Sequence, residues 1–150
     1  MPAPGAPPPT PGPALDPWQS PLARAALASQ ARGHLRSLGA RQEGIRAMAV
    51  VTFDGLLLAS ELADGVGAER LGAMCASLLA LATRTSEEVA GGELRQVILD
   101  GARGPMLLSR AGALGVLAVA ADRSAHLGRL MLEARATAQA LAALYAGARV

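Results

Sequence analysis

Two apolar, β-prone runs joined by Asp54-Gly55 constrain the fold of this 150-residue chain more than any other feature. The first run spans residues 45–53 and the second spans residues 56–60. Glycine supplies the positive φ angle that a tight turn requires, so this pattern predicts a β-hairpin. Because the first run is apolar at nearly every position, we expect it to form a central strand that is covered on both faces.

Proline divides the chain into two parts. Nine of the ten prolines lie within residues 2–21, where fixed φ angles and missing N–H donors prevent a helix or an internal strand. We therefore expect residues 1–20 to be a disordered, Pro-rich tail and residues 21–150 to form one domain. Ser20 followed by Pro21 is typical of a helix start, because Ser caps free N–H groups and Pro suits the first helical turn.

Three segments have the apolar spacing of amphipathic helices. The first is residues 21–38, which we expect to end at Gly39 in a left-handed conformation. The second is residues 68–90, whose apolar stripe is wider than one sheet contact requires. The third is residues 125–146, with Ser124 as its N-cap. The apolar faces consist of Leu27, Ala31, Leu35 and Leu38 in the first helix and of Leu71, Met74, Cys75, Leu78, Leu79 and Ala82 in the second. The predicted buried face of the third helix consists of Leu127, Leu130, Met131, Ala134, Ala138, Leu141 and Tyr145.

Three further β-prone runs, residues 93–100, 105–110 and 114–121, are separated by short Gly-containing links. This pattern predicts a meander of antiparallel strands. The order helix, two strands, helix, three strands, helix fits an α/β (α+β) sandwich in which helices cover the faces of a sheet. The run 93–100 carries apolar side chains on both faces, so it would be prone to aggregation as a bare sheet edge.

Residue types that carry catalysis are scarce. All fourteen basic residues are Arg, which excludes a P-loop lysine and a Schiff-base lysine. Cys75 is the single cysteine, which excludes an intrachain disulfide and a multi-Cys zinc site and favours a cytoplasmic location. His34 and His126 lack the spacing of metal ligands, so surface or capping roles are expected. We predict no catalytic site, no metal and no cofactor.

Positive charge is concentrated around the first predicted helix. The net charge of +2 is too small to indicate nucleic-acid binding. Residues 22–46 nevertheless carry five arginines against Glu43, which indicates either a surface for an acidic partner or, more simply, a solvated helix face. The uncharged stretches are shorter than the ~18 apolar residues that span a bilayer, so no membrane insertion is expected. The five arginines are Arg24, Arg32, Arg36, Arg41 and Arg46.

Several strings, taken in order, resemble the roadblock (dynein light chain) family, including its bacterial MglB-like members. Residues 51–60 resemble the family's first hairpin, residues 92–98 its third strand, and residues 117–128 with 133–135 its fifth strand and last helix. The resemblance covers about residues 22–147. It implies a roadblock/profilin-like sandwich: a five-stranded antiparallel sheet in the order 2-1-5-4-3, with the first and third helices on one face and the second helix on the other.

The resemblance also implies a homodimer in which third strands pair edge to edge and second helices pack together. Such an assembly would bury the apolar edge and the wide stripe described above. MglB-like proteins act on Ras-like small GTPases, so the implied function is a non-enzymatic adaptor that binds such a GTPase and regulates its nucleotide cycle. Arg70 and Arg84 flank the stripe and are candidate partner contacts. The predicted dimer interface consists of Met74, Leu78, Leu81, Leu94, Gln96 and Ile98.

Two other functions stay open at this stage. A light-chain-like scaffold subunit would bridge larger proteins without regulating a GTPase, and the Pro-rich tail would then be a docking segment. A small-ligand sensor or enzyme on a similar sandwich would need a deep pocket with convergent polar groups. The sequence offers only Thr52, Ser77 and Gln96 as buried polar candidates for such a pocket.

Overall fold

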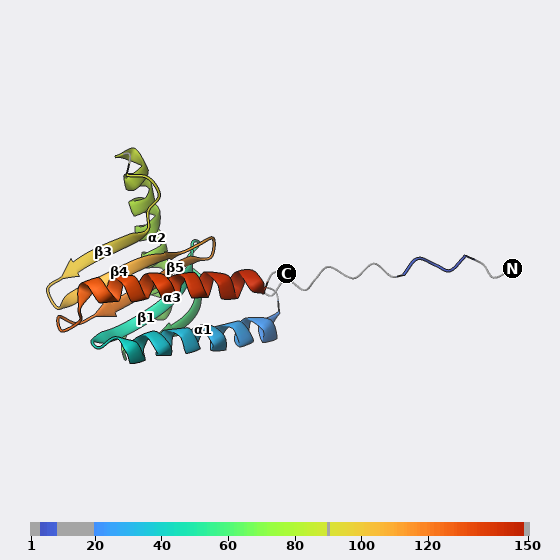
Figure 1. Cartoon of the computed structure of the whole chain (residues 1–150), viewed down its shortest axis with the longest axis horizontal. Coiled ribbons are helices and arrows are strands. Elements are labelled where there is room, and N and C mark those ends of the chain that lie inside the picture. The colour runs from blue at the N-terminus through green and yellow to red at the C-terminus, as the bar shows by residue number, and fades with distance from the viewer. Residues whose placement is uncertain (1–3, 9–19, 90, 149–150) are drawn as a thin grey trace.

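The computed structural model describes residues 4–8, 20–89 and 91–148. Five antiparallel strands form one sheet in the order β2-β1-β5-β4-β3, and three helices cover its faces (Figure 1). This confirms the predicted fold class and strand order. The elements are α1 (Pro21–Arg41), β1 (Ile45–Thr52), β2 (Leu57–Glu61), α2 (Ala68–Glu88), β3 (Gln96–Gly101), β4 (Gly104–Ala111), β5 (Gly115–Ala121) and α3 (Leu127–Gly147).

The predicted tail falls mostly on residues outside the described part of the chain. Of residues 1–20, the structure describes residues 4–8, which are exposed and have no regular secondary structure, and Ser20. Disorder of the remaining tail residues stays a prediction.

The predicted hairpin is present as β1 and β2. Gly55 has a φ of +92° in the turn, and the Thr52 N–H donates to the Leu56 carbonyl at 2.9 Å. β1 lies between β2 and β5, so both of its edges are paired. Met48 and Val50 enter the core on one face of the sheet, whereas Ala49 and Val51 enter the core on the other. The expectation of a central, doubly covered strand is confirmed.

Helix α1 begins as predicted and ends later than predicted. The Ser20 hydroxyl accepts from the Ala23 N–H at 3.3 Å, with Pro21 in the first turn. The predicted end at Gly39 is wrong, because the helix continues to Arg41 and the left-handed glycine is Gly44, with a φ of +86°. A Cβ on Gly44 would also lie 2.7 Å from an Asp122 carboxylate oxygen, so the chain has no room for a side chain there.

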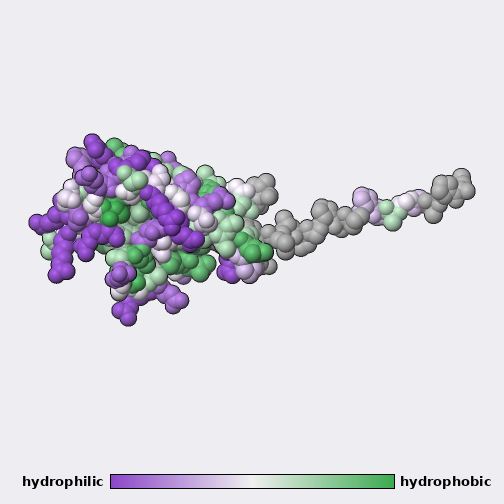
Figure 2. Space-filling model, turned by 90° about the horizontal axis from the view of Figure 1, so that it is seen from below, coloured by the Kyte–Doolittle hydropathy of each residue, from purple (hydrophilic) through white to green (hydrophobic). Residues whose placement is uncertain are grey.

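The face of α1 that meets the core is the predicted one, since Leu27, Ala31, Leu35 and Leu38 are all buried. Two of its arginines form ion pairs, which the count of charges in the sequence does not reveal. Arg36 pairs with Glu61 at 3.0 Å, and Arg41 pairs with Glu133 at 3.1 Å. Viewed from below, the side nearest α1, the surface mixes hydrophilic and hydrophobic side chains (Figure 2). A solvated, partly ion-paired helix face therefore accounts for these charges.

Helix α3 starts two residues later than predicted, and Ser124 is not its cap. The cap is His126, whose Nδ1 accepts from the Arg129 N–H at 3.1 Å. Ser124 instead donates its N–H to Asp122 at 2.9 Å, and these hydrogen bonds lower the pKa of the Asp122 carboxyl. Leu127 in the first turn is 38% exposed, so its predicted burial is wrong. Met131 is partly buried, and the other predicted core positions of α3 are buried.

Helix α2 matches its predicted start and ends at Glu88, close to the predicted end. Cys75 and Leu79 are buried, and Leu71 and Leu78 are partly buried against the sheet, while Met74 stays exposed. Gly72 allows the helix to approach the hairpin closely, because a Cβ there would meet the Gly55 carbonyl oxygen at 2.9 Å.

The predicted meander is present, although its first strand is shorter than predicted. β3 begins at Gln96 rather than at residue 93. The Arg110 N–H still donates to the Arg95 carbonyl at 3.1 Å, so the chain aligns beside β4 before the regular strand starts. β4 and β5 have nearly the predicted limits.

Candidate functional site

The two faces of the sheet are covered unequally. α1 and α3 pack on one face, and α2 alone packs on the other. In Figure 1 the later part of α2 extends past the β3 edge of the sheet. Part of the helix therefore projects beyond the strands that it covers.

An apolar groove of about 500 Å³ lies along α2, where the helix meets the β3–β4 side of the sheet. Met74 is 59% exposed and Leu81 is 63% exposed, and both lie on the same face of α2, two turns apart. Contiguous apolar surface of this kind marks an interaction site. The lining residues are Leu71, Ala73, Met74, Cys75, Ser77, Leu78, Leu81, Leu99 and Met106.

The structure brings together three of the predicted interface residues. Met74, Leu78 and Leu81 all line the groove, as their helical spacing indicates. Leu99 and Met106 form the opposite wall. Leu99 belongs to the run that a second copy is expected to bury, whereas Met106 is not among the predicted interface residues. Alternation along β3 places Leu99 on the same side of the strand as Val97. The sequence alone does not show that this side faces α2.

The other three predicted interface residues do not line this groove. Leu94 is half-buried and packs against the core below α2. The Gln96 amide nitrogen donates to the Ser109 hydroxyl at 2.8 Å and to the Met131 carbonyl at 3.0 Å, so Gln96 faces α3. Ile98 is 42% exposed on the same side as Gln96. Their role in an interface stays a prediction.

β3 is an edge strand, because β4 is its one neighbour in the sheet. Ile98 and Leu99 leave apolar surface exposed on its two faces, at 42% and 37%. An exposed edge with apolar side chains on both faces is a template for pairing with another strand. The groove and this edge adjoin, since Leu99 belongs to both.

Arg70 and Arg84 are both exposed on α2, as expected for partner contacts, but neither lines the groove. They are fourteen positions apart on one helix, so their Cα atoms lie about 21 Å apart at ~1.5 Å per residue. The two arginines of one chain therefore cannot converge on a single phosphate group.

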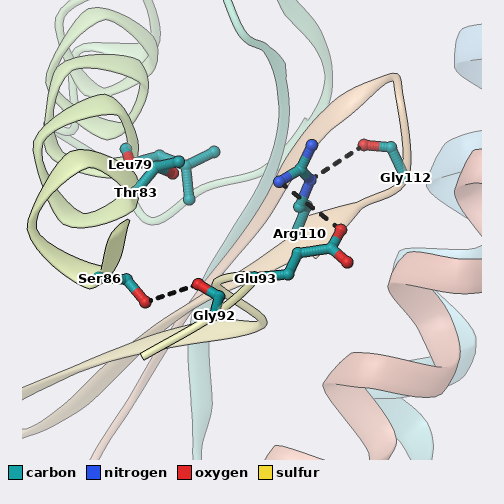
Figure 3. A network of polar contacts seen from close by, with 7 residues as sticks. All are labelled: Leu79, Thr83, Ser86, Gly92, Glu93, Arg110 and Gly112. Atoms are coloured by element: carbon teal, nitrogen blue, oxygen red, sulfur yellow. Dashed lines mark hydrogen bonds and ion pairs between the residues drawn. The ribbon is translucent and has the colours of Figure 1, made fainter. Parts of the chain in front are cut away.

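A polar network joins the end of α2 to the strand edge (Figure 3). The Ser86 hydroxyl donates to the Gly92 carbonyl at 3.0 Å, which connects α2 to the segment that leads into β3. Arg110 lies 3.8 Å from Glu93, donates to the Gly112 carbonyl at 3.4 Å, and stacks over Phe53 at 5.4 Å. The network thus fixes Arg110 at the mouth of a second hollow.

This second hollow, of about 650 Å³, has a polar lining from three segments of the chain. Arg95 precedes β3, Arg110 lies one residue before the end of β4, and Arg135 and Gln139 come from α3. Glu93 is the one carboxylate among its lining residues, so positive charge exceeds negative charge. Within the described residues, Arg95 and Arg135 have no carboxylate within 4.0 Å.

The sequence profile of the Roadblock/LC7 domain matches residues 32–121, which extend from α1 through β5. The chain belongs to the Roadblock/LC7 family. An uncharacterized protein of Methanocaldococcus jannaschii, MJ1340, is 35% identical over 105 residues, covering 70% of this chain and 91% of the relative. The resemblance stated from the sequence is thereby confirmed.

The fold of this Roadblock/LC7 chain is similar to that of MglB in solved structures. An MglB described as having a tetrameric arrangement superposes with a TM-score of 0.73 at 21% identity, covering 82% of this chain and 93% of that one. The gliding protein MglB of Thermus thermophilus superposes with a TM-score of 0.72 at 19% identity, covering 81% and 93%. At these identities the likeness concerns the fold.

The Roadblock/LC7 chain offers little reactive chemistry in the part that the structure describes. Burial raises the pKa of the Cys75 thiol, which keeps it protonated and inert in the core below α2. His126 is occupied as a helix cap. The described residues contain no group of three metal-ligating side chains and no helix that is apolar and long enough to cross a membrane. What they present is an apolar groove along α2 beside the edge strand β3.

Proposed function

We propose that this protein is a non-enzymatic, homodimeric adaptor of the cytoplasm that binds a Ras-like small GTPase and regulates its nucleotide cycle. The observation that carries the proposal is the apolar groove along α2, which continues into the unpaired edge of β3. The described residues of a single chain leave both features uncovered, and a second copy would supply the same two features in reverse order.

A twofold assembly suits this surface for a physical reason. An isologous interface places the same patch on both partners, so an edge strand meets an edge strand and an apolar helix meets its copy. Met74 and Leu81 would then contact apolar side chains instead of water. Burial of apolar surface contributes about 25 cal/mol of favourable free energy for each Å² removed from water. The predicted interface would also include Leu78, Leu94, Gln96 and Ile98.

The GTPase part of the proposal is supported by the likeness to MglB. A switch region of a GTPase needs a broad composite surface rather than a deep pocket, and two α2 helices side by side would form one. Arg70 and Arg84 lie toward the two ends of α2, where they would border this platform. We assign them as partner contacts and not as inserted arginine fingers, because each is a separate exposed side chain.

The test is capture of Ras-like GTPases from the source organism, each loaded with GDP or with a non-hydrolysable GTP analogue, on the immobilised full-length chain. We expect one GTPase to bind in one nucleotide state and to change its rate of GTP hydrolysis when the chain is added. Equal or absent binding in both states, with an unchanged rate, would reject GTPase regulation. The light-chain-like scaffold would then be favoured, provided that the chain is dimeric.

The arginine contacts need their own variant. The double substitution Arg70→Ala/Arg84→Ala should weaken GTPase binding while leaving the dimer intact, because both side chains are exposed and outside the groove. Unchanged affinity for the GTPase would remove both residues from the contact surface.

A further inference from the structure

The backbone of β3 limits how a second copy can pair with it. The Arg95 carbonyl accepts from Arg110 of β4, so Arg95 directs its backbone groups toward β4. Backbone direction alternates along a strand, and the β3–β4 pairing runs without a register shift from Gln96 to Gly101. The N–H and C=O groups of Gln96, Ile98 and Asp100 therefore point to the open side.

A twofold antiparallel pair must place outward-pointing residues opposite outward-pointing residues. An axis beside any residue from Gln96 to Asp100 meets this condition, and the axes nearest the middle of the strand, beside Val97, Ile98 or Leu99, pair more of β3 than those at its ends. An axis at Ile98 is the one choice that pairs all three outward residues with one another. Gln96 then lies opposite Asp100 of the second copy, and Ile98 lies opposite itself.

Side chains favour the same register. On the α2 side, the axis at Ile98 sets Val97 against the second copy's Leu99, which joins the two grooves across the interface. On the α3 side it covers the exposed Ile98 with its own copy. An axis at Leu99 would instead set the Asp100 carboxylate against Ile98, and an axis at Val97 would set Leu99 against Arg95.

We infer that the second copy of this chain pairs through β3 in the register centred on Ile98, and that its Asp100 carboxylate completes the arginine-lined hollow by pairing with Arg135. This rests on the homodimer of the proposed function. In this register Asp100 of one copy lies about 5.5 Å, Cα to Cα, from Gln96 of the other. It is on the α3 side of the sheet, as Gln96 is.

Arg135 is the partner that the charges select. Both N–H groups of the Gln96 amide are already used, on Ser109 and Met131, so Gln96 cannot donate to an incoming carboxylate. Arg135 follows Met131 by one helical turn and lines the hollow beside Leu94 and Arg95. Neither Arg135 nor Asp100 has an ion-pair partner among the described residues of a single chain.

Disulfide trapping tests the register. In a Cys75→Ala background, which removes the single cysteine, we compare Ile98→Cys, Val97→Cys and Leu99→Cys under mild oxidation. We expect Ile98→Cys to form a covalent dimer by itself, because paired Cα atoms about 5.5 Å apart are within disulfide range. Val97→Cys and Leu99→Cys should link to each other when mixed but poorly to themselves. Self-linking by either of them, without linking by Ile98→Cys, would overturn the register.

Charge reversal tests the ion pair. Asp100→Arg and Arg135→Asp should each weaken dimerisation about ten-fold in sedimentation analysis, and the double variant should regain affinity to within about three-fold of the parent. Double-variant affinity no better than that of either single variant would overturn the pairing. A homodimer with a dissociation constant of about 1 μM should be almost fully formed at about 100 μM. If the parent protein sediments as a monomer at that concentration, the homodimer itself is rejected. A dimer that links through another position rejects the register alone.

Discussion

The two faces of the sheet differ in how completely one chain can cover them. Eighteen buried residues form the core under α1 and α3, whereas seven form the core under α2. The first face is closed by two helices that contact each other as well as the sheet. The second is closed by one helix, whose outer side still carries Met74 and Leu81 in the open. The first face is thus closed by the chain's own helices, and the second leaves apolar side chains of α2 exposed.

The largest effect is expected from damage to the closed face. Leu117 on β5 is fully buried, so Leu117→Ala should lower the free energy of unfolding by about 3 kcal/mol, through lost burial and the cavity left behind. Urea denaturation measured by circular dichroism at low protein concentration checks this. Leu81→Ala is the control, and it should change monomer stability by less than about 0.5 kcal/mol. Equal losses would erase the distinction between the faces.

A charge on the open face should affect association rather than folding. Leu81→Arg should weaken dimerisation by about 30-fold or more, because it places a charge in the centre of the proposed apolar interface. Its matched control is Leu22→Arg, which is also highly exposed, at 84%, but lies at the start of α1. Analytical ultracentrifugation of both variants checks the prediction. Equal sedimentation of the two would show that the groove does not mediate the dimer.

Two helical glycines, one on each side of the sheet, differ in the space around them. Gly72→Ala should destabilise the protein by about 1–2 kcal/mol, because its Cβ would press on the Gly55 carbonyl and displace α2. Gly33→Ala in α1 meets nothing within 4 Å, so it should stabilise the protein by about 0.5–1 kcal/mol. Thermal denaturation of the pair tests both signs. A stabilising Gly72→Ala would mean that α2 does not need this close approach.

The smallest effect concerns the link from β5 to α3 on the closed face. Hydrogen bonds from Ser124 lower the pKa of Asp122, so the folded state favours its ionised form. The resulting stabilisation is present above the unfolded pKa of about 3.9 and is lost as pH falls through the lower folded value. Asp122→Ala should therefore lower the melting temperature slightly near neutral pH and have a diminishing effect below about pH 4. An effect that grows on acidification would contradict this assignment.

Much of the fold could be predicted because its signals are local. The Asp54-Gly55 turn, the Ser20-Pro21 start and the burial of Leu35 and Leu38 follow from turn chemistry, capping and 3.6-residue spacing. The errors lie at boundaries. Capping by His126 was not distinguished from capping by Ser124, because the choice depends on Asp122 engaging Ser124.

The candidate site was only partly predictable. The spacing of Met74, Leu78 and Leu81 placed them on one stripe, and the structure confirms that they share a groove. The position of Gln96 could not be read from alternation, since its amide is held by Ser109 and Met131, 13 and 35 residues away. The opposite wall of the groove, Leu99 and Met106, likewise comes from strands distant in sequence from most of α2.

Local sequence is enough to specify the helices, the hairpin and the excess of apolar residues on α2 and β3, because each depends on neighbours within a few positions. The tertiary structure determines which side of β3 meets which helix, which backbone groups of β3 point away from β4, and which arginines line the second hollow. These properties depend on strand order and register. A shift of one residue in the pairing would exchange the faces without altering the local pattern.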